Sequence, residues 1–204
     1  MEFLSSELAI IALTFGAIFL VELPDKTFIA TLVMATKYRP LYVWIGVSAA
    51  FVVQTMVAVV LGKLAGFLPS DVVHGFAGLM FLIGSVMLFR QARRADTEEL
   101  AEEQEFAAKA TPAEGFRVIL TCFLILFAAE WGDLSQLLTL SLVAKYDAPA
   151  AVFIGAVLAL MTVSALAVIV GKQLLKWVKP HVLHYLGGTV CLILAGVVAA
   201  DLLR

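Results

Sequence analysis

The chain has 204 residues, of which 62% are hydrophobic and 15% are charged, with a mean hydropathy of +1.01 and a formal net charge of −2. These values exclude an ordinary soluble domain and predict an all-α polytopic membrane protein, because the apolar runs are long enough to cross a bilayer. No stripe of lysine and arginine is present to neutralise a phosphate backbone, so no nucleic-acid partner is expected.

Six apolar runs follow one another along the chain, and a polar stretch at residues 90–115 separates the first three from the last three. We therefore expect a first three-helix repeat over residues 1–90, a cytoplasmic acidic linker over 91–116 and a second three-helix repeat over 117–204. The six predicted spans are residues 8–35, 41–67, 72–89, 118–144, 150–170 and 182–203.

The first predicted span carries the charged motif E-L-P-D-K-T-F near its midpoint. Glu22 and Asp25 are three residues apart, which places two carboxylates on one face of a helix. Pro24 has no amide hydrogen and is expected to free the carbonyl of Leu20. Freed carbonyls at membrane depth commonly coordinate cations when they line a cavity. The motif is therefore a candidate half of a cation site with a break in its helix.

Two polar features lie between this motif and the second half. Gln54, within the second span, either faces the same cavity or joins two helices. The linker contains the acidic run A-D-T-E-E-L-A-E-E-Q-E-F, which is expected to be a solvated connector, with metal sensing as the alternative.

The fourth predicted span contains a second motif, E-W-G-D-L-S-Q. Glu130 and Asp133 repeat the spacing of the first two acids, and Gly132 weakens the helix between them. Where the first motif has Lys26, which would neutralise Glu22 or compete with an ion, the second has Leu134. Three neutral side chains lie in the motifs: Thr27, Ser135 and Gln136. They are expected to supply oxygen ligands or to hold the carboxylates, and the hydroxyls could instead bond to their own helices.

The two halves align with each other at an offset of about 108 to 110 residues. Because each half contains an odd number of spans, the second copy must enter the membrane with opposite polarity. The sequence therefore predicts two inverted repeats, with the substrate site near the midplane at their interface. The matching pairs include Glu22/Glu130, Asp25/Asp133, Thr31/Thr139, Lys37/Lys145, Gly46/Gly155 and Gly62/Gly171.

Four carboxylates near the bilayer centre would together cost roughly 10–14 kcal/mol if they were ionised and faced lipid. They must therefore face the interior of the bundle. Eight hard oxygens without cysteine or histidine suit Mn²⁺, Ca²⁺ or Mg²⁺. Carboxylates crowded together at low dielectric also favour proton uptake when no cation is bound, which predicts exchange of metal for protons.

Loop charges predict the orientation. Ten lysines and arginines flank the connections between spans 1 and 2, 3 and 4, and 5 and 6, against three on the opposite side. The positive-inside rule makes the first side cytoplasmic, which predicts a multi-pass protein of the plasma (inner) membrane with both termini extracytoplasmic.

The two motifs resemble the paired E-x-G-D-[K/R]-[S/T] signatures of the calcium/cation antiporter family that includes transmembrane protein 165 and the MneA-type manganese exporters. The resemblance covers nearly the whole chain, with two departures: Pro24 replaces a glycine and Leu134 replaces a basic residue. It implies a cation/proton antiporter for Mn²⁺ or Ca²⁺ without a prosthetic group, in which Glu22, Asp25, Glu130 and Asp133 form the ion site.

Two other classes stay open at this point. An exporter of amino acids or another small organic solute would share six spans and an inverted repeat but would need a larger pocket and fewer clustered acids. An intramembrane hydrolase would use paired acids, but no nucleophile or histidine cluster accompanies them here, so no enzyme activity is expected. The oligomeric state is not predicted.

Overall fold

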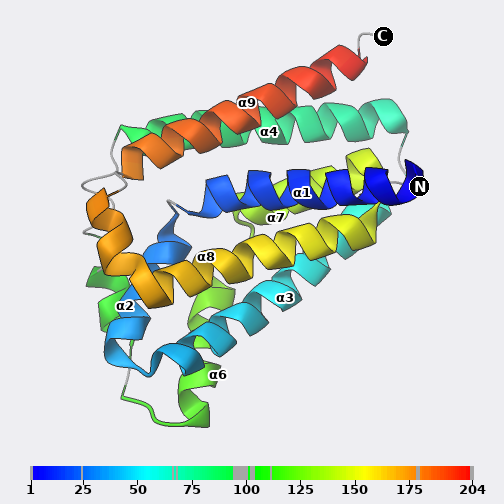
Figure 1. The fold of residues 1–204 in the computed structure, drawn as a ribbon. Helices are drawn as coiled ribbons and strands as arrows, with labels where there is room; N and C mark the ends of the chain where they lie inside the picture. Colours follow the sequence, from blue (N-terminus) through cyan, green and yellow to red (C-terminus); the bar gives the residue numbers. More distant parts are fainter. Residues whose placement is uncertain are drawn as a thin grey trace.

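The computed structural model describes residues 2–23, 25–65, 67, 69–93, 101, 104–110, 112–177 and 180–202, and these residues form an all-helical structure (Figure 1). Prolines stand at the first position of three long helices, where the fixed φ of proline suits a helix start and its missing amide costs nothing. The long helices are α1 (Glu2–Glu22), α2 (Lys26–Lys37), α3 (Pro40–Ala65), α4 (Ser70–Ala92), α6 (Phe116–Ala129), α7 (Leu134–Tyr146), α8 (Pro149–Trp177) and α9 (Pro180–Leu202).

The class of an all-helical membrane protein is confirmed. Among the described residues, α3, α4 and α8 each contain a stretch long and apolar enough to cross a membrane, and two bent pairs raise the number of candidate spans to five. Only 33–50% of the residues in the three long stretches are buried, so much of the apolar surface is left to face lipid. The described apolar run of α9, His184–Ala200, is shorter, so the sixth span stays a prediction.

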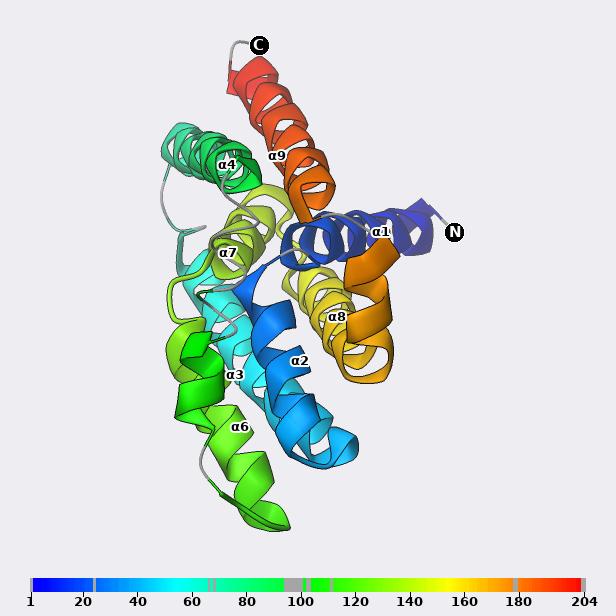
Figure 2. The ribbon, with the colours of Figure 1, turned by 90° about the vertical axis from the view of Figure 1, so that its left-hand side faces the viewer.

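The first and fourth predicted spans are each broken into two helices. α1 and α2 meet at an angle of 69°, and α6 and α7 at 72°. Figure 2 shows α2 and α6 running away from the breaks toward one end of the molecule. Both breaks fall at the two acidic motifs.

Each half of the chain packs mainly against the other half. The helix α3 lies against α6 and α7, α8 lies against α1 and α2, and α4 pairs with α9 along its length (Figures 1 and 2). Two glycines make close approaches to the backbone of another helix: a Cβ on Gly46 would lie 2.5 Å from the carbonyl oxygen of Ile119, and one on Gly155 would lie 2.6 Å from that of Ile11. These pairs match at the offset of the repeat, so the packing has the internal symmetry expected of duplicated units.

The apolar interior is divided into two main parts. One cluster lies mainly among α2, α3, α6 and α8 and includes Ile18 of α1, and the other lies mainly among α1, α4, α7 and α9 and includes Val152 of α8. Helices α2 and α6 contribute to the first cluster and α7 to the second, whereas α1 contributes to both.

The described part of the linker is exposed at most positions, but one side chain is buried. Residues 104–109 are helical, and Phe106 is only 3% exposed within the cluster around α2 and α6. Lys37, at the end of α2, donates a hydrogen bond to the carbonyl of Ala107. Lys109 donates one to Glu105 and thereby lowers the pKa of that exposed carboxyl. Most of the acidic run lies outside the described residues.

Candidate cation site at the two helix breaks

Both broken spans stop and restart in the same way. Glu22 is the last residue of α1 and Glu130 the C-cap of α6, while Asp25 and Asp133 are the N-caps of α2 and α7. In each break the aspartate amide donates a hydrogen bond to the glutamate carbonyl, at 3.1 Å in the first and 3.2 Å in the second. Both aspartates have extended backbone, with ψ of 166° and 168°. The two motifs therefore fold alike.

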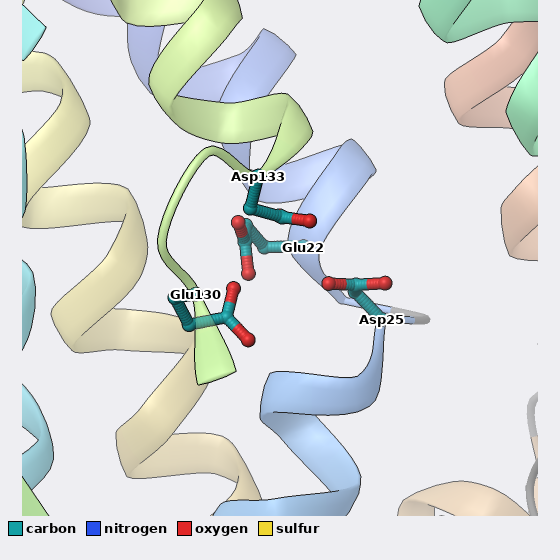
Figure 3. A group of neighbouring side chains, drawn as sticks. All are labelled: Glu22, Asp25, Glu130 and Asp133. Carbon is teal, nitrogen blue, oxygen red and sulfur yellow. The ribbon is translucent and has the colours of Figure 1, made fainter. Parts of the chain in front are cut away.

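The four carboxylates meet between these breaks (Figure 3). One oxygen from each of Glu22, Asp25, Glu130 and Asp133 can be chosen so that all lie within 4.8 Å of one another. Glu22 is fully buried and Glu130 is 2% exposed. Neither aspartate side chain caps its own helix, and both are turned toward the glutamates (Figure 3).

The route to this arrangement differs from the prediction. Glu22 and Asp25 were expected on one face of a helix, but α1 ends at Glu22 and α2 begins at Lys26, so the prediction of a shared helical face is wrong. The acids converge because the chain turns between them and the two breaks face each other. The Pro24 prediction lies outside the described residues.

Five buried carboxylate oxygens in the cluster have no hydrogen-bond partner: both of Glu22, both of Glu130 and Oδ2 of Asp25. Buried polar groups without partners are costly, and buried charges more so. Protons or a cation bound between the acids would satisfy them. Because the donors are all hard oxygens, a hard divalent cation fits the set.

The broken helices add fixed dipoles. The N-termini of α2 and α7 and the C-termini of α1 and α6 all end at the cluster. Helix N-termini favour negative side chains, and helix C-termini with their free carbonyls favour cations. The breaks therefore stabilise both the acids and a cation between them.

Lys26 contacts the site from the first repeat. Its Nζ donates to Oδ1 of Asp133 at 3.3 Å, with side chains 32% and 16% exposed. The expectation named Glu22 as its partner, but the observed partner belongs to the other repeat. Leu134, at the matching position, is 9% exposed and packs on α4, where a Cβ on Gly84 would lie 2.6 Å from its Cδ1.

The neutral side chains divide into two groups. The hydroxyls of Thr27 and Ser135 lie beside the Glu22 carboxylate, and the buried Thr27 Oγ1 makes no hydrogen bond. Gln136 instead closes the second break: its Oε1 accepts from the amide of Gly132 at 3.2 Å, and its Nε2 donates to the carbonyl of Glu130 at 2.9 Å. This role was missed, although spacing of four residues from Gly132 is a signal for it.

Two other predicted contributors contact the broken helices. Gln54 Nε2 donates to the carbonyl of Phe127 at 3.0 Å, in the last turn of α6, where carbonyls lack helical partners. The carbonyl of Leu20 faces α9, 3.2 Å from where a Cβ on Gly187 would lie. Gly132 has φ of +78°, a conformation that glycine adopts readily.

The fold and the site together define a secondary transporter for cations, with broken helices meeting at an acidic cluster. The family model described as "Divalent cation/proton antiporter GDT1" matches residues 10–96 and 118–203 of the chain. The chain therefore belongs to the GDT1 family of divalent cation/proton antiporters, and it is a transporter rather than an enzyme. The family resemblance of the two motifs is confirmed.

Relatives of the chain occur in several organisms. The chain is 30% identical to the GDT1-like protein sll0615 of Synechocystis over 176 residues, which are 82% of this chain and 85% of that protein. It is 28% identical over 210 residues to protein PAM71, chloroplastic, of Arabidopsis thaliana, with 94% of this chain and 56% of that protein covered. A GDT1-like protein of Schizosaccharomyces pombe is 28% identical over 232 residues, covering 92% of this chain and 79% of that protein. No solved structure matches the chain.

Proposed function

We propose that this antiporter exports Mn²⁺ from the cytosol in exchange for protons, with Glu22, Asp25, Glu130 and Asp133 as the ion ligands. The observation that carries the proposal is the meeting of four carboxylate oxygens within 4.8 Å of one another, two of them from almost fully buried glutamates. Ca²⁺ is the second candidate cargo, because it accepts the same donors.

The size of the cluster favours a cation larger than Mg²⁺. Oxygens on opposite sides of a Ca²⁺ ion lie about 4.6–5.2 Å apart, against about 4.0–4.2 Å for Mg²⁺. The chosen carboxylate oxygens lie up to 4.8 Å apart, which exceeds the separation around Mg²⁺ and falls within the range for Ca²⁺. Mg²⁺ also gives up its water reluctantly, which disfavours it in a buried site.

The count of neutral oxygens favours Mn²⁺ over Ca²⁺. Ca²⁺ takes six to eight oxygen ligands, whereas Mn²⁺ is typically bound by six. The Gln136 amide oxygen already accepts from Gly132, and Gln54 is held at Phe127. The four carboxylates, Thr27 and Ser135 are the main donors, and with one oxygen from each they supply the six ligands that Mn²⁺ typically takes.

Exchange follows from competition for the same oxygens. A bound cation keeps the carboxylates ionised, and an empty site takes up protons, so the affinity for metal falls as the pH falls. We propose that rocking of the broken helices exposes the loaded site to each side in turn. The plasma membrane location and the extracytoplasmic termini are part of the proposal, and the loop charges support the placement of the termini.

The test is proton flux driven by metal in proteoliposomes. Purified protein is reconstituted with a pH-sensitive dye inside, and Mn²⁺, Ca²⁺ and Mg²⁺ are added in parallel. We expect the fastest flux with Mn²⁺ and the slowest with Mg²⁺. Flux with Ca²⁺ but none with Mn²⁺ would overturn the choice of metal.

Two variants test the ligands. Glu22→Gln and Glu130→Gln keep the shape of the side chain but remove a charge, and each is expected to lower the flux by roughly tenfold or more. Glu105→Gln, which changes an exposed acid of the linker, is the matched control and should leave the flux unchanged. Full activity of both site variants would remove these acids from the mechanism.

A further inference from the structure

The inference concerns Lys26, and it rests on the proposed function of the four-acid site. Lys26 is the first residue of α2, and its ammonium contacts Asp133 of the second repeat at 3.3 Å. It thereby places a positive charge on the rim of the cluster. The matching position holds Leu134, whose side chain packs on α4, so Asp25 receives no equivalent cation and keeps an unpaired buried oxygen.

The ammonium of Lys26 can move away from the Asp133 carboxylate. It is a single contact of 3.3 Å rather than a two-pronged one, and the Lys26 side chain is 32% exposed. A single contact of this length is weaker than a bidentate pair. A long lysine side chain can also swing its ammonium toward water while its stem stays packed.

Charge then decides what can displace the ammonium. A monovalent ion brings the same charge that Lys26 already supplies, so an exchange gains no Coulomb energy. A divalent cation brings twice that charge to the same oxygens. We propose that Lys26 is a specificity-determining residue: its tethered ammonium holds Asp133 in the empty site, gives way to a divalent cation, and excludes Na⁺ and K⁺.

The test measures binding of Mn²⁺ to the purified full-length protein by isothermal titration calorimetry. Each titration is run in about 100 mM NaCl and in choline chloride at the same ionic strength, which keeps screening constant. For the wild type, Na⁺ should change the Kd for Mn²⁺ by less than about twofold. For Lys26→Met, Na⁺ should raise it by about fivefold or more, because Na⁺ can now occupy the site. Lys26→Arg keeps the charge and should behave as the wild type does.

A reciprocal variant adds the cation that the second motif lacks. Leu134→Lys adds a second positive charge next to Asp133 in the sequence, at the first position of α7, and should weaken Mn²⁺ binding by roughly tenfold or more through Coulomb repulsion. Leu134→Met is the matched control, since it changes the packing on Gly84 without adding charge, and it should bind Mn²⁺ as the wild type does.

The outcomes separate this inference from the proposed function. If the wild type binds Mn²⁺ and Lys26→Met is as indifferent to Na⁺ as the wild type, the inference is overturned while the four-acid site stands. The same holds if Leu134→Lys binds Mn²⁺ as tightly as Leu134→Met. If the wild type binds none of Mn²⁺, Ca²⁺ and Mg²⁺, the proposed function itself has failed.

Discussion

Single residues set the difference between two otherwise similar half-sites. Asp25 and Asp133 share their backbone conformation and their hydrogen bond to the preceding glutamate. Their neighbours differ, since one is followed by Lys26 and the other by Leu134. The site is therefore symmetric in its backbone but not in its charge, and the two sides of the membrane need not meet equal ligand sets.

The second break requires glycine at one position. Gly132 has φ of +78°, where a side chain is strained, so Gly132→Ala should lower the free energy of unfolding by about 1 kcal/mol or more. Thermal unfolding in detergent measures the change. Gly196→Ala is the control: Gly196 lies within α9 with nothing within 4 Å of an added Cβ, so the variant should be at least as stable as the wild type. A Gly132 variant as stable as this control would show that the turn tolerates a side chain.

The four acids could be singled out in the sequence because their cost in lipid is large and their spacing repeats, and the structure brings them together. The partner of Lys26 was not predictable. Asp133 is 107 positions away, and the contact depends on how two breaks from different repeats face each other. Spacing within one motif carries no information on that placement.

At the scale of helices and loops, the two helix breaks could be predicted from the sequence, because a helix-breaking residue lies between the acids of each motif. The packing of the linker could not be predicted. An acidic, helix-favouring run is typical of a solvated connector. Within it, Phe106 is a lone aromatic, and periodicity does not show that it enters the core beside α2 and α6. The linker is thus anchored on a half-helix that must move if the broken spans rock.

Phe106 is expected to hold the linker in place. Phe106→Ala removes a side chain that is 3% exposed and should lower the free energy of unfolding by about 3 kcal/mol, because a buried aromatic ring leaves a cavity. It should also speed tryptic cleavage after Lys109, which then loses its contact with the ring. Phe116→Ala, at a position 76% exposed, should change neither property. Equal cleavage rates in the two variants would argue against an anchored linker.

On the scale of the whole molecule, the repeats are interlocked. Gly46 of α3 approaches Ile119 of α6, and Gly155 of α8 approaches Ile11 of α1. The alignment of the two halves predicted the duplication, but it could not show that each copy packs on the other. The hydrophobic helices of both copies have similar apolar faces, so the sequence pattern does not indicate whether a helix packs within its own copy or against the other copy.

The two glycine contacts should respond alike to the same change. Gly46→Ala and Gly155→Ala each place a Cβ within 2.6 Å of a backbone carbonyl oxygen, so each should cost about 1–3 kcal/mol of stability. Gly16→Ala, in α1 with open space around it, is the control and should show no loss. The comparison uses thermal unfolding of the three variants in one detergent. A loss in one glycine variant only would contradict the paired packing.

Interlocked halves also constrain how the protein is made. While the ribosome has delivered only α1, α2 and α3 to the membrane, the face of α3 around Gly46 has no protein to pack against, since its partner α6 follows the linker. The helices α1, α2 and α3 therefore remain separately inserted segments until the second acidic motif has been translated. A product truncated within the linker is therefore expected to be cleared by membrane proteases rather than to persist as a smaller carrier.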